Sequence, residues 1–307
     1  MLSKSSIALI ACLITNTAFG LTFLFTRQAL YDVSVLSLLS WRFSLAFVAM
    51  TLLKFCGILK INLKGRSLKP LFLIGIFHPI LYFVGETVGI GLTSTSEAGV
   101  IIATMPIVTM LLAVLILREM PTRLQAVSII VSVIGVCVVV LGRHTVATLN
   151  PLGYAALAVA VLAGALFFIT SRRAADYSSA EKTYVMMGMG FVVFTSAALV
   201  EHISQGTVRA WLTLPIADPW LWLPFVYLGI VTSIFGFMLQ NYSIAVLGVN
   251  RVSSLAGFVT IVTIVAGVLV LNETFTFTQG VGTALIILGA TGANYVRKKP
   301  TNQSPPT

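Results

Sequence analysis

The sequence predicts an all-α integral membrane protein in which ten transmembrane helices form two inverted five-helix repeats. Three observations lead to this fold class. Hydrophobic residues make up 58% of the 307 residues and charged residues only 9%, whereas a soluble domain carries about 25% charged residues. Apolar runs recur along the chain, and its mean hydropathy is +1.01. One apolar segment also occurs twice, at residues 104–125 and again at 258–279.

Ten segments have the length and composition of membrane spans. A helix needs about 20 mostly apolar residues to cross the hydrocarbon core. The segments are 6–27, 34–56, 70–91, 97–117, 123–142, 151–171, 183–203, 220–241, 248–271 and 277–296. Three helix starts, at 121–123, 150–151 and 276–278, carry the proline or small hydroxyl residues that suit a first turn. The longest loop, 204–219, is expected to hold a short interfacial helix.

The distribution of Lys and Arg predicts that both termini are cytoplasmic. With that orientation, 15 of the 19 cations fall on the cytoplasmic side, as the positive-inside rule requires. The exceptions are Arg27, Arg42, Arg143 and Arg209. The net charge of +10 indicates an anionic membrane surface as partner, not a nucleic acid, because the cations lie between apolar runs and not on one solvated face.

The duplication sets the domain organisation. Nine of the 22 paired positions of the two segments are identical at an offset of 154 residues, among them Glu119 and Glu273. Because each unit holds an odd number of spans, the second unit must cross the membrane in the opposite sense. We expect one repeat at 1–143 and the other at 150–299, followed by a disordered tail at 300–307.

Weaker duplication extends the pattern beyond this segment. Residues 19–27 resemble residues 164–172, and Glu86 falls opposite Gln240 at the 154-residue offset. In that register only the first half keeps a carboxylate, so a site between the halves is electrically asymmetric.

These motifs resemble the EamA-like family of the drug/metabolite transporter superfamily. The residues that carry the resemblance are the repeated apolar run, Pro106 with Thr260, Leu117-Arg118-Glu119 with Leu271-Asn272-Glu273, Gly135 with Gly289, and Trp41-Arg42-Phe43. The resemblance covers residues 6–296. It implies a ten-helix carrier of the inner (cytoplasmic) membrane, usually an exporter of amino acids, other small metabolites or drugs, which works by alternating access. Neither the substrate nor the coupling ion transfers with the resemblance.

The third span carries the strongest candidates for a substrate site. A charge at the centre of a membrane helix costs about 2.5–3.5 kcal/mol on insertion scales, and Glu86 is the carboxylate that lies well inside a span. His78 and Tyr82 fall near the same helix face as Glu86, at helical spacing. Pro79 removes a backbone hydrogen bond between them and is expected to kink the helix. We therefore expect His78, Tyr82 and Glu86 to face a polar cavity.

Each polar candidate also has a structural interpretation. Glu86 either neutralises Arg42 in an ion pair or handles substrate or protons. Arg42 either makes that pair or binds a substrate carboxylate. His78 is either a hydrogen-bonded packing residue or a functional group.

Two further pairs of polar residues lie within spans. Asn16 and Thr17 in the first span, and Gln240 and Asn241 in the eighth, either line the cavity or bond a neighbouring helix. Glu119 and Glu273 recur past the end of a helix, so we expect them to accept hydrogen bonds from the first turn of the next helix and not to act on substrate.

Other function classes lack their motifs. Asp32, Asp176 and Asp218 are isolated, so no aspartate cluster suits a magnesium pyrophosphate, and no ATP-binding G-x-x-x-x-G-K-[ST] or zinc-binding H-E-x-x-H is found. We expect no enzymatic activity, cofactor or metal. The expected partners are a small-molecule substrate and the lipid bilayer, with protons as coupling ion and a homodimer left open. A facilitator, a multidrug-type carrier for organic cations and a non-transport membrane protein are the alternative functions.

Overall fold

The computed structural model describes residues 3–117, 123–141, 150–247 and 257–293, together with 252 and 255. Within these ranges the chain is helical, without strands. The α-helices are α1 (Lys4–Ala29), α2 (Val35–Phe55), α3 (Lys69–Gly75), α4 (Tyr82–Leu92), α5 (Thr95–Ile102), α6 (Met105–Leu117), α7 (Arg123–Leu141), α8 (Pro151–Arg173), α9 (Ser179–Gln205), α10 (Val208–Ala217), α11 (Trp222–Val226), α12 (Phe237–Leu247), α14 (Gly257–Leu271) and α15 (Phe277–Ala293). Two π-helical segments, η1 (Ile76–Leu81) and η4 (Tyr227–Gly236), and a 3-10 turn, η3 (Pro219–Leu221), connect some of them.

Helix is present in each of the ten ranges that the sequence indicated. Seven helices in the described part of the chain are long and apolar enough to cross a membrane: Lys4–Ala29, Val35–Phe55, Lys69–Leu92, Thr95–Leu112, Pro151–Arg173, Ser179–Gln205 and Pro219–Leu247. In α7, α14 and α15 the described apolar runs are shorter, at 10–17 residues. Within the loop at 204–219, α10 forms the short helix that was expected.

Capping residues fix the helix starts near the predicted boundaries. Asn150 accepts hydrogen bonds from the backbone N–H groups of Leu152 and Gly153, and Pro151 opens α8. Thr276 Oγ1 accepts from the backbone N–H of Gln279 at the start of α15. Both starts agree with the sequence prediction. In the third predicted start, α7 begins at residue 123, while 121 and 122 lie outside the described residues.

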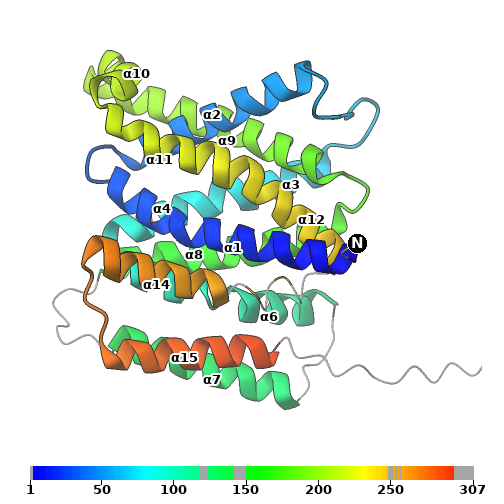
Figure 1. Cartoon of the computed structure of the whole chain (residues 1–307), viewed down its shortest axis with the longest axis vertical. Helices are drawn as coiled ribbons and strands as arrows, with labels where there is room; N and C mark the ends of the chain where they lie inside the picture. The colour runs from blue at the N-terminus through cyan, green and yellow to red at the C-terminus, as the bar shows by residue number, and fades with distance from the viewer. Residues whose placement is uncertain are drawn as a thin grey trace, which may run out of the picture.

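The helices lie side by side, so that the bundle has two ends (Figure 1). We call the end with residues 56–68 and 174–178 the basic end, because Lys60, Lys64 and Arg66 lie there. The other end, which we call the Glu273 end, holds residues 30–34, 93–94 and 272–276.

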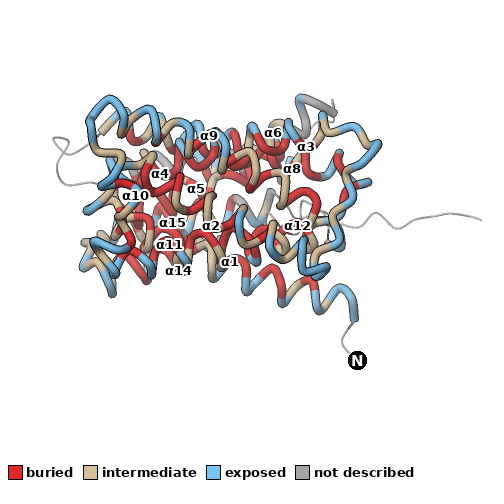
Figure 2. Tube along the Cα trace, turned by 90° about the horizontal axis from the view of Figure 1, so that it is seen from above, coloured by how far each residue is buried: buried red, intermediate tan, exposed pale blue. Residues whose placement is uncertain are grey.

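Apolar side chains cover the outside of the bundle as well as its interior. Figure 2 shows buried residues on the inner sides of the helices and exposed residues around them. Many of the exposed ones are large and apolar, such as Val133 at 54%, Val200 at 68% and Leu269 at 74% exposure. A soluble protein rarely exposes so much apolar surface, so lipid is the natural environment of these faces. The chain is a multi-pass membrane protein.

Helices α7 and α15 pack as a pair at one side of the bundle (Figure 1). A Cβ at Gly135 would lie 2.9 Å from the backbone N of Ile286, and a Cβ at Gly289 would lie 2.1 Å from Ser132 Oγ. Gly289 and Ile286 follow Gly135 and Ser132 by 154 residues each. The contact is therefore reciprocal. Gly135 of α7 packs against Ile286 of α15, and the matching Gly289 of α15 packs against the matching Ser132 of α7.

Candidate functional site

The break in the third span begins at His78 and Pro79. His78 has φ −146° and ψ 104°, outside the helical region, and the surrounding residues form the π-helical segment η1. Pro79 has no N–H to donate, and its ring crowds the preceding turn, so the helix widens at this point. The expected kink is present, and it directs His78 into the bundle, where the side chain is 5% exposed.

A corresponding π-helical segment lies 154 residues later, without a proline inside it. Residues 230–235 correspond to 76–81 at the repeat offset and lie within η4. There, the hydroxyls of Thr232 and Ser233 both donate to the carbonyl oxygen of Leu228, at 2.8 and 2.7 Å. Such hydroxyl bonds to a preceding carbonyl compete with the backbone ladder and bend helices. Both halves thus contain a π-helical segment at matching positions, while the departure from helical φ and ψ occurs at His78.

A cavity lies between the third span and α12, near the middle of the bundle. Its volume is about 80 Å³. A water molecule needs roughly 10–15 Å³ on the same scale, so the cavity has room for several waters. The lining residues are Asn16, Phe19, Thr22, Phe23, Arg42, His78, Tyr82, Phe83, Glu86, Ile102, Ala103, Met105, Gly164, Phe167, Phe168, Phe237, Gln240, Val259 and Thr260. They come from both halves of the chain.

Aromatic rings surround His78 on several sides. Its ring centroid lies 4.3 Å from that of Tyr82 in a stacked arrangement, and 4.7 Å from those of Phe167 and Phe237. Phe83 meets it edge-on at 4.9 Å. Rings at these separations pack favourably. The cavity therefore has aromatic walls, with polar side chains placed between them.

Glu86 is the acidic group of this cavity. Its side chain is 2% exposed, and its Oε1 accepts a hydrogen bond of 2.7 Å from the Tyr82 hydroxyl. Its Oε2 is buried without a hydrogen-bond partner, and so are Nδ1 of His78 and Oε1 of Gln240. Gln240 is the counterpart of Glu86 at the 154-residue offset, and both line the cavity. The structure thus gathers His78, Tyr82, Glu86 and Gln240 at one cavity.

Arg42 is held by hydroxyl groups and not by Glu86. Its Nε donates to Ser233 Oγ at 2.9 Å and its Nη2 donates to Thr232 Oγ1 at 3.1 Å. Its guanidinium carbon lies 4.0 Å from the centroid of the Phe83 ring. Within the described ranges no ion pair within 4.0 Å joins Arg42 to Glu86, so the direct contact that the sequence offered as one alternative is wrong. The two charges still interact at longer range.

The remaining predicted residues separate into two groups. Asn16 lines the cavity, and its Nδ2 donates to the carbonyl oxygen of Leu255 at 2.9 Å. Thr17 is exposed, and its hydroxyl donates to the carbonyl oxygen of Leu13. Since successive helical residues point about 100° apart, Thr17 turns away from the cavity that Asn16 faces. The expectation for Thr17 is corrected accordingly.

Asn241 also falls outside the cavity, although it is buried. Its Oδ1 accepts from Ser171 Oγ at 2.9 Å and its Nδ2 donates to Thr183 Oγ1 at 3.4 Å. The amide therefore joins α12 to α8 and α9. This is the helix-bonding alternative that the sequence left open.

The aromatic walls were missed as site residues, although the duplication contains a signal for them. Phe23 and Phe168 both line the cavity and are 145 residues apart, which is the offset between residues 19–27 and 164–172. Phe83 and Phe237 also line it and are 154 residues apart. Positions that match across the repeat therefore share the cavity.

At the Glu273 end, the carboxylate of Glu273 caps a helix of the other half. Its Oε1 accepts from the backbone N–H of Thr95 at 2.7 Å, and its Oε2 accepts from the backbone N–H and hydroxyl of Ser96 at 2.9 and 2.6 Å. We expected a cap on the helix that follows, but α15 is capped by Thr276, and Glu273 caps α5 instead. Glu119 lies outside the described residues.

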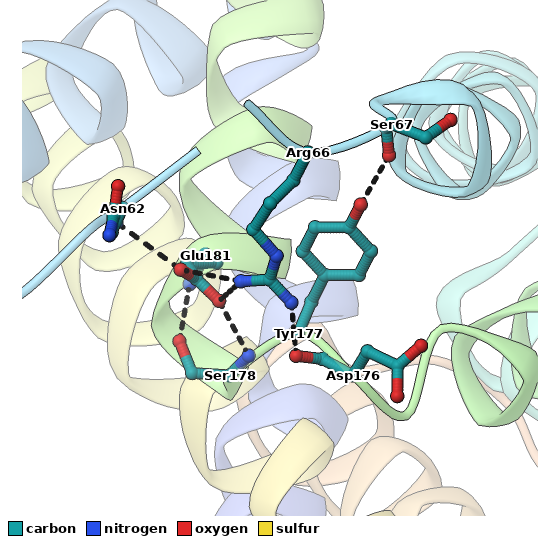
Figure 3. A network of polar contacts seen from close by, with 7 residues as sticks. All are labelled: Asn62, Arg66, Ser67, Asp176, Tyr177, Ser178 and Glu181. Atoms are coloured by element: carbon teal, nitrogen blue, oxygen red, sulfur yellow. Dashed lines mark hydrogen bonds and ion pairs between the residues drawn. The ribbon is translucent and has the colours of Figure 1, made fainter. Parts of the chain in front are cut away.

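At the basic end, a polar network joins the loop before α3 to the start of α9 (Figure 3). Arg66 Nη1 lies 3.2 Å from Glu181 Oε1, which also accepts from the backbone N–H of Asn62 at 3.2 Å. Arg66 Nη2 donates to the carbonyl oxygen of Asp176, and its guanidinium lies 4.1 Å from the Tyr177 ring centroid. Like the Glu273 contact, this network connects residues of 1–143 with residues of 150–299.

Comparison with known proteins decides the family. The EamA-like transporter family matches residues 6–141 and again 151–295. The chain belongs to the EamA-like transporter family. Two curated transporters are similar over nearly the whole chain. The uncharacterized transporter YcxC of Bacillus subtilis (strain 168) is 32% identical, over 96% of this chain and 95% of its own length. An uncharacterized transporter of Archaeoglobus fulgidus is 28% identical, over 90% and 94%.

A solved crystal structure shares the fold of this EamA-like chain. It aligns with a TM-score of 0.58 at 20% sequence identity and covers 95% of both chains. At this identity the likeness concerns the fold alone.

Proposed function

We propose that this chain is a secondary transporter that exports a small amphipathic metabolite across the cytoplasmic membrane by alternating access, with the aromatic cavity as its substrate site. The observation that carries the proposal is the position of this cavity. It lies near mid-bundle, is lined by matched positions of both halves, and has a polar contact between the halves at either end. Family membership supports transport as the activity.

The proposed topology has ten spans, two inverted repeats at 1–143 and 150–299, and cytoplasmic termini. The reciprocal contact of α7 and α15 supports it, since Gly135 and Gly289 exchange partners as two-fold-related residues do. The paired π-helical segments at 76–81 and 230–235 support it as well. The basic end then faces the cytoplasm and the Glu273 end faces outward.

The contacts at the two ends give the proposed cycle its gates. Opening the Glu273 end requires the carboxylate of Glu273 to leave the first turn of α5, because the two belong to different halves. Opening the basic end requires Arg66 to leave Glu181. Alternating access needs one of these contacts to persist while the other is broken.

The function is tested in two steps. Metabolite profiles of cells with and without the protein identify compounds that its expression depletes inside and enriches outside. Each candidate is then tested for counterflow in liposomes that contain the purified protein. We expect at least one compound to exchange, and Glu86→Gln to slow that exchange while Glu201→Gln, a carboxylate bonded to Ser34 at the end of the bundle, does not. Absence of exchange for every profiled compound would remove the proposed function.

A further inference from the structure

The cavity carries unpaired acceptors. Among the described side chains, Oε2 of Glu86, Oε1 of Gln240 and Nδ1 of His78 are buried without a hydrogen-bond partner, and all three residues line the cavity. The other such atoms in this part of the chain are threonine hydroxyls, which rotate to suit their surroundings. A buried carboxylate oxygen without a donor is costly. A ligand that supplies donors would remove that cost.

Two of the donors that line the cavity are, in contrast, already bonded to protein. The Tyr82 hydroxyl donates to Glu86 Oε1 and the Asn16 amide donates to Leu255. Arg42 directs its Nε and Nη2 at Ser233 and Thr232, and its guanidinium lies against the face of Phe83. Two of the Arg42 nitrogens are engaged with protein hydroxyls, whereas Glu86 Oε2 has no donor among the described residues. The buried carboxylate is thus the group that a ligand N–H would satisfy.

The rings determine the rest of the ligand. The ring centroids of Phe19 and Phe237 are 5.2 Å apart, and those of Phe167 and Phe168 are 5.7 Å apart. All four rings line the cavity. Such faces pack against an apolar body and attract a cation placed over them. An ammonium group next to Glu86 would have both a carboxylate and aromatic faces around it.

We infer that the cavity binds small molecules through a protonated amine held by Glu86, with an aromatic or alkyl body against the phenylalanine walls. Gln240 Oε1 supplies a further acceptor for the amine hydrogens, and His78 Nδ1 supplies another in the tautomer protonated at Nε2. This inference rests on the proposed function only in taking the bound molecule to be the transported one.

Three probes with the same ring and chain test the inference. Phenethylamine has the amine alone, phenylalanine has amine and carboxylate, and 3-phenylpropanoate has the carboxylate alone. Binding to the purified full-length protein in detergent is measured by calorimetry and by thermal stabilisation. We expect phenethylamine and phenylalanine, which share the amine, to bind and 3-phenylpropanoate not to bind. Loss of a charge-assisted hydrogen bond of about 1.5–3 kcal/mol should weaken phenethylamine about tenfold to a hundredfold in Glu86→Gln.

Controls separate the amine site from folding. Glu86→Asp keeps the charge and should bind phenethylamine more tightly than Glu86→Gln does. Glu201→Gln should bind phenethylamine as tightly as the unmodified protein. If Glu86→Gln does not fold, Gln240→Leu is used, with a smaller loss expected. Binding of the acid in place of the amine, no binding of any probe, or binding unaffected by these variants would overturn the inference. Binding without counterflow would instead leave it intact and remove the proposed function.

Discussion

Glu273 accepts two hydrogen bonds from Ser96, one from its backbone N–H at 2.9 Å and one from its hydroxyl at 2.6 Å. The two residues are 177 positions apart and belong to different halves of the chain. A carboxylate at a helix N-terminus is stabilised by the free first-turn amides and by the helix dipole. The end of α14 is thereby attached to the start of α5.

Substitution Glu273→Gln should weaken this attachment. The amide is neutral and cannot accept on both sides, so we expect the free energy of unfolding to fall by about 1–3 kcal/mol. Thermal unfolding of the purified protein measures the change. Glu201→Gln serves as the matched control with a smaller effect, and equal stability of the two variants would show that the Glu273 contact contributes little.

The Arg66 network should be measured by a double-mutant cycle. Arg66→Met, Glu181→Gln and the double variant report the coupling between the two side chains, which we expect at about 0.5–1 kcal/mol, because Arg66 is one-third exposed. Arg66→Met should cost more than this coupling alone, since it also loses the bond to the Asp176 carbonyl and the contact with Tyr177. A coupling of zero would remove the ion pair from the proposed gate at the basic end.

Gly289→Ala should disrupt the packing of α7 against α15. The added Cβ would lie 2.1 Å from Ser132 Oγ and 2.6 Å from the carbonyl oxygen of Ser128, so the helices must separate. On the same helix, a Cβ at Gly280 would lie 3.8 Å from Phe275, which is an ordinary contact. We expect Gly289→Ala to cost about 1–3 kcal/mol, as overpacking does, and Gly280→Ala to be tolerated. The thermal stability and the folded yield of the two variants are measured. Similar values for Gly289→Ala and Gly280→Ala would refute the close contact between α7 and α15.

Neighbouring residues on α1 test the placement of the cavity. Asn16 lines it and Thr17 points away. Asn16→Ala should slow counterflow of the identified substrate about fivefold, the equivalent of one hydrogen bond of about 1 kcal/mol. Thr17→Ala should leave the rate unchanged. The reverse order of effects would show that the other face of α1 meets the substrate.

The sequence predicts the helices well because span length and apolar composition are local properties. It also places His78, Tyr82 and Glu86 on one face, since helical spacing is local too. Partners across the bundle are not local. The sequence therefore could not show that Arg42 is held by Thr232 and Ser233, or that Glu273 caps α5 and not α15. Those pairings depend on how the two halves pack.

The aromatic walls of the cavity were only partly predictable from the sequence. The offsets of 145 and 154 residues contain the pairs Phe23/Phe168 and Phe83/Phe237. However, an apolar ring within an apolar span gives no sign of its own that it faces a cavity and not lipid. Only the positions of the neighbouring helices distinguish the two.

Access to the cavity from each face of the membrane tests alternating access most directly. In a variant without Cys12, Cys56 and Cys137, a single cysteine at the cavity-lining position Ala103 is labelled by a membrane-impermeant thiol reagent from either side of oriented vesicles. We predict that Glu273→Gln raises labelling from the face next to Glu273, and that Arg66→Met raises it from the opposite face. If both variants raised labelling from the same face, or neither changed it, the two end contacts would not be the gates of an alternating-access cavity.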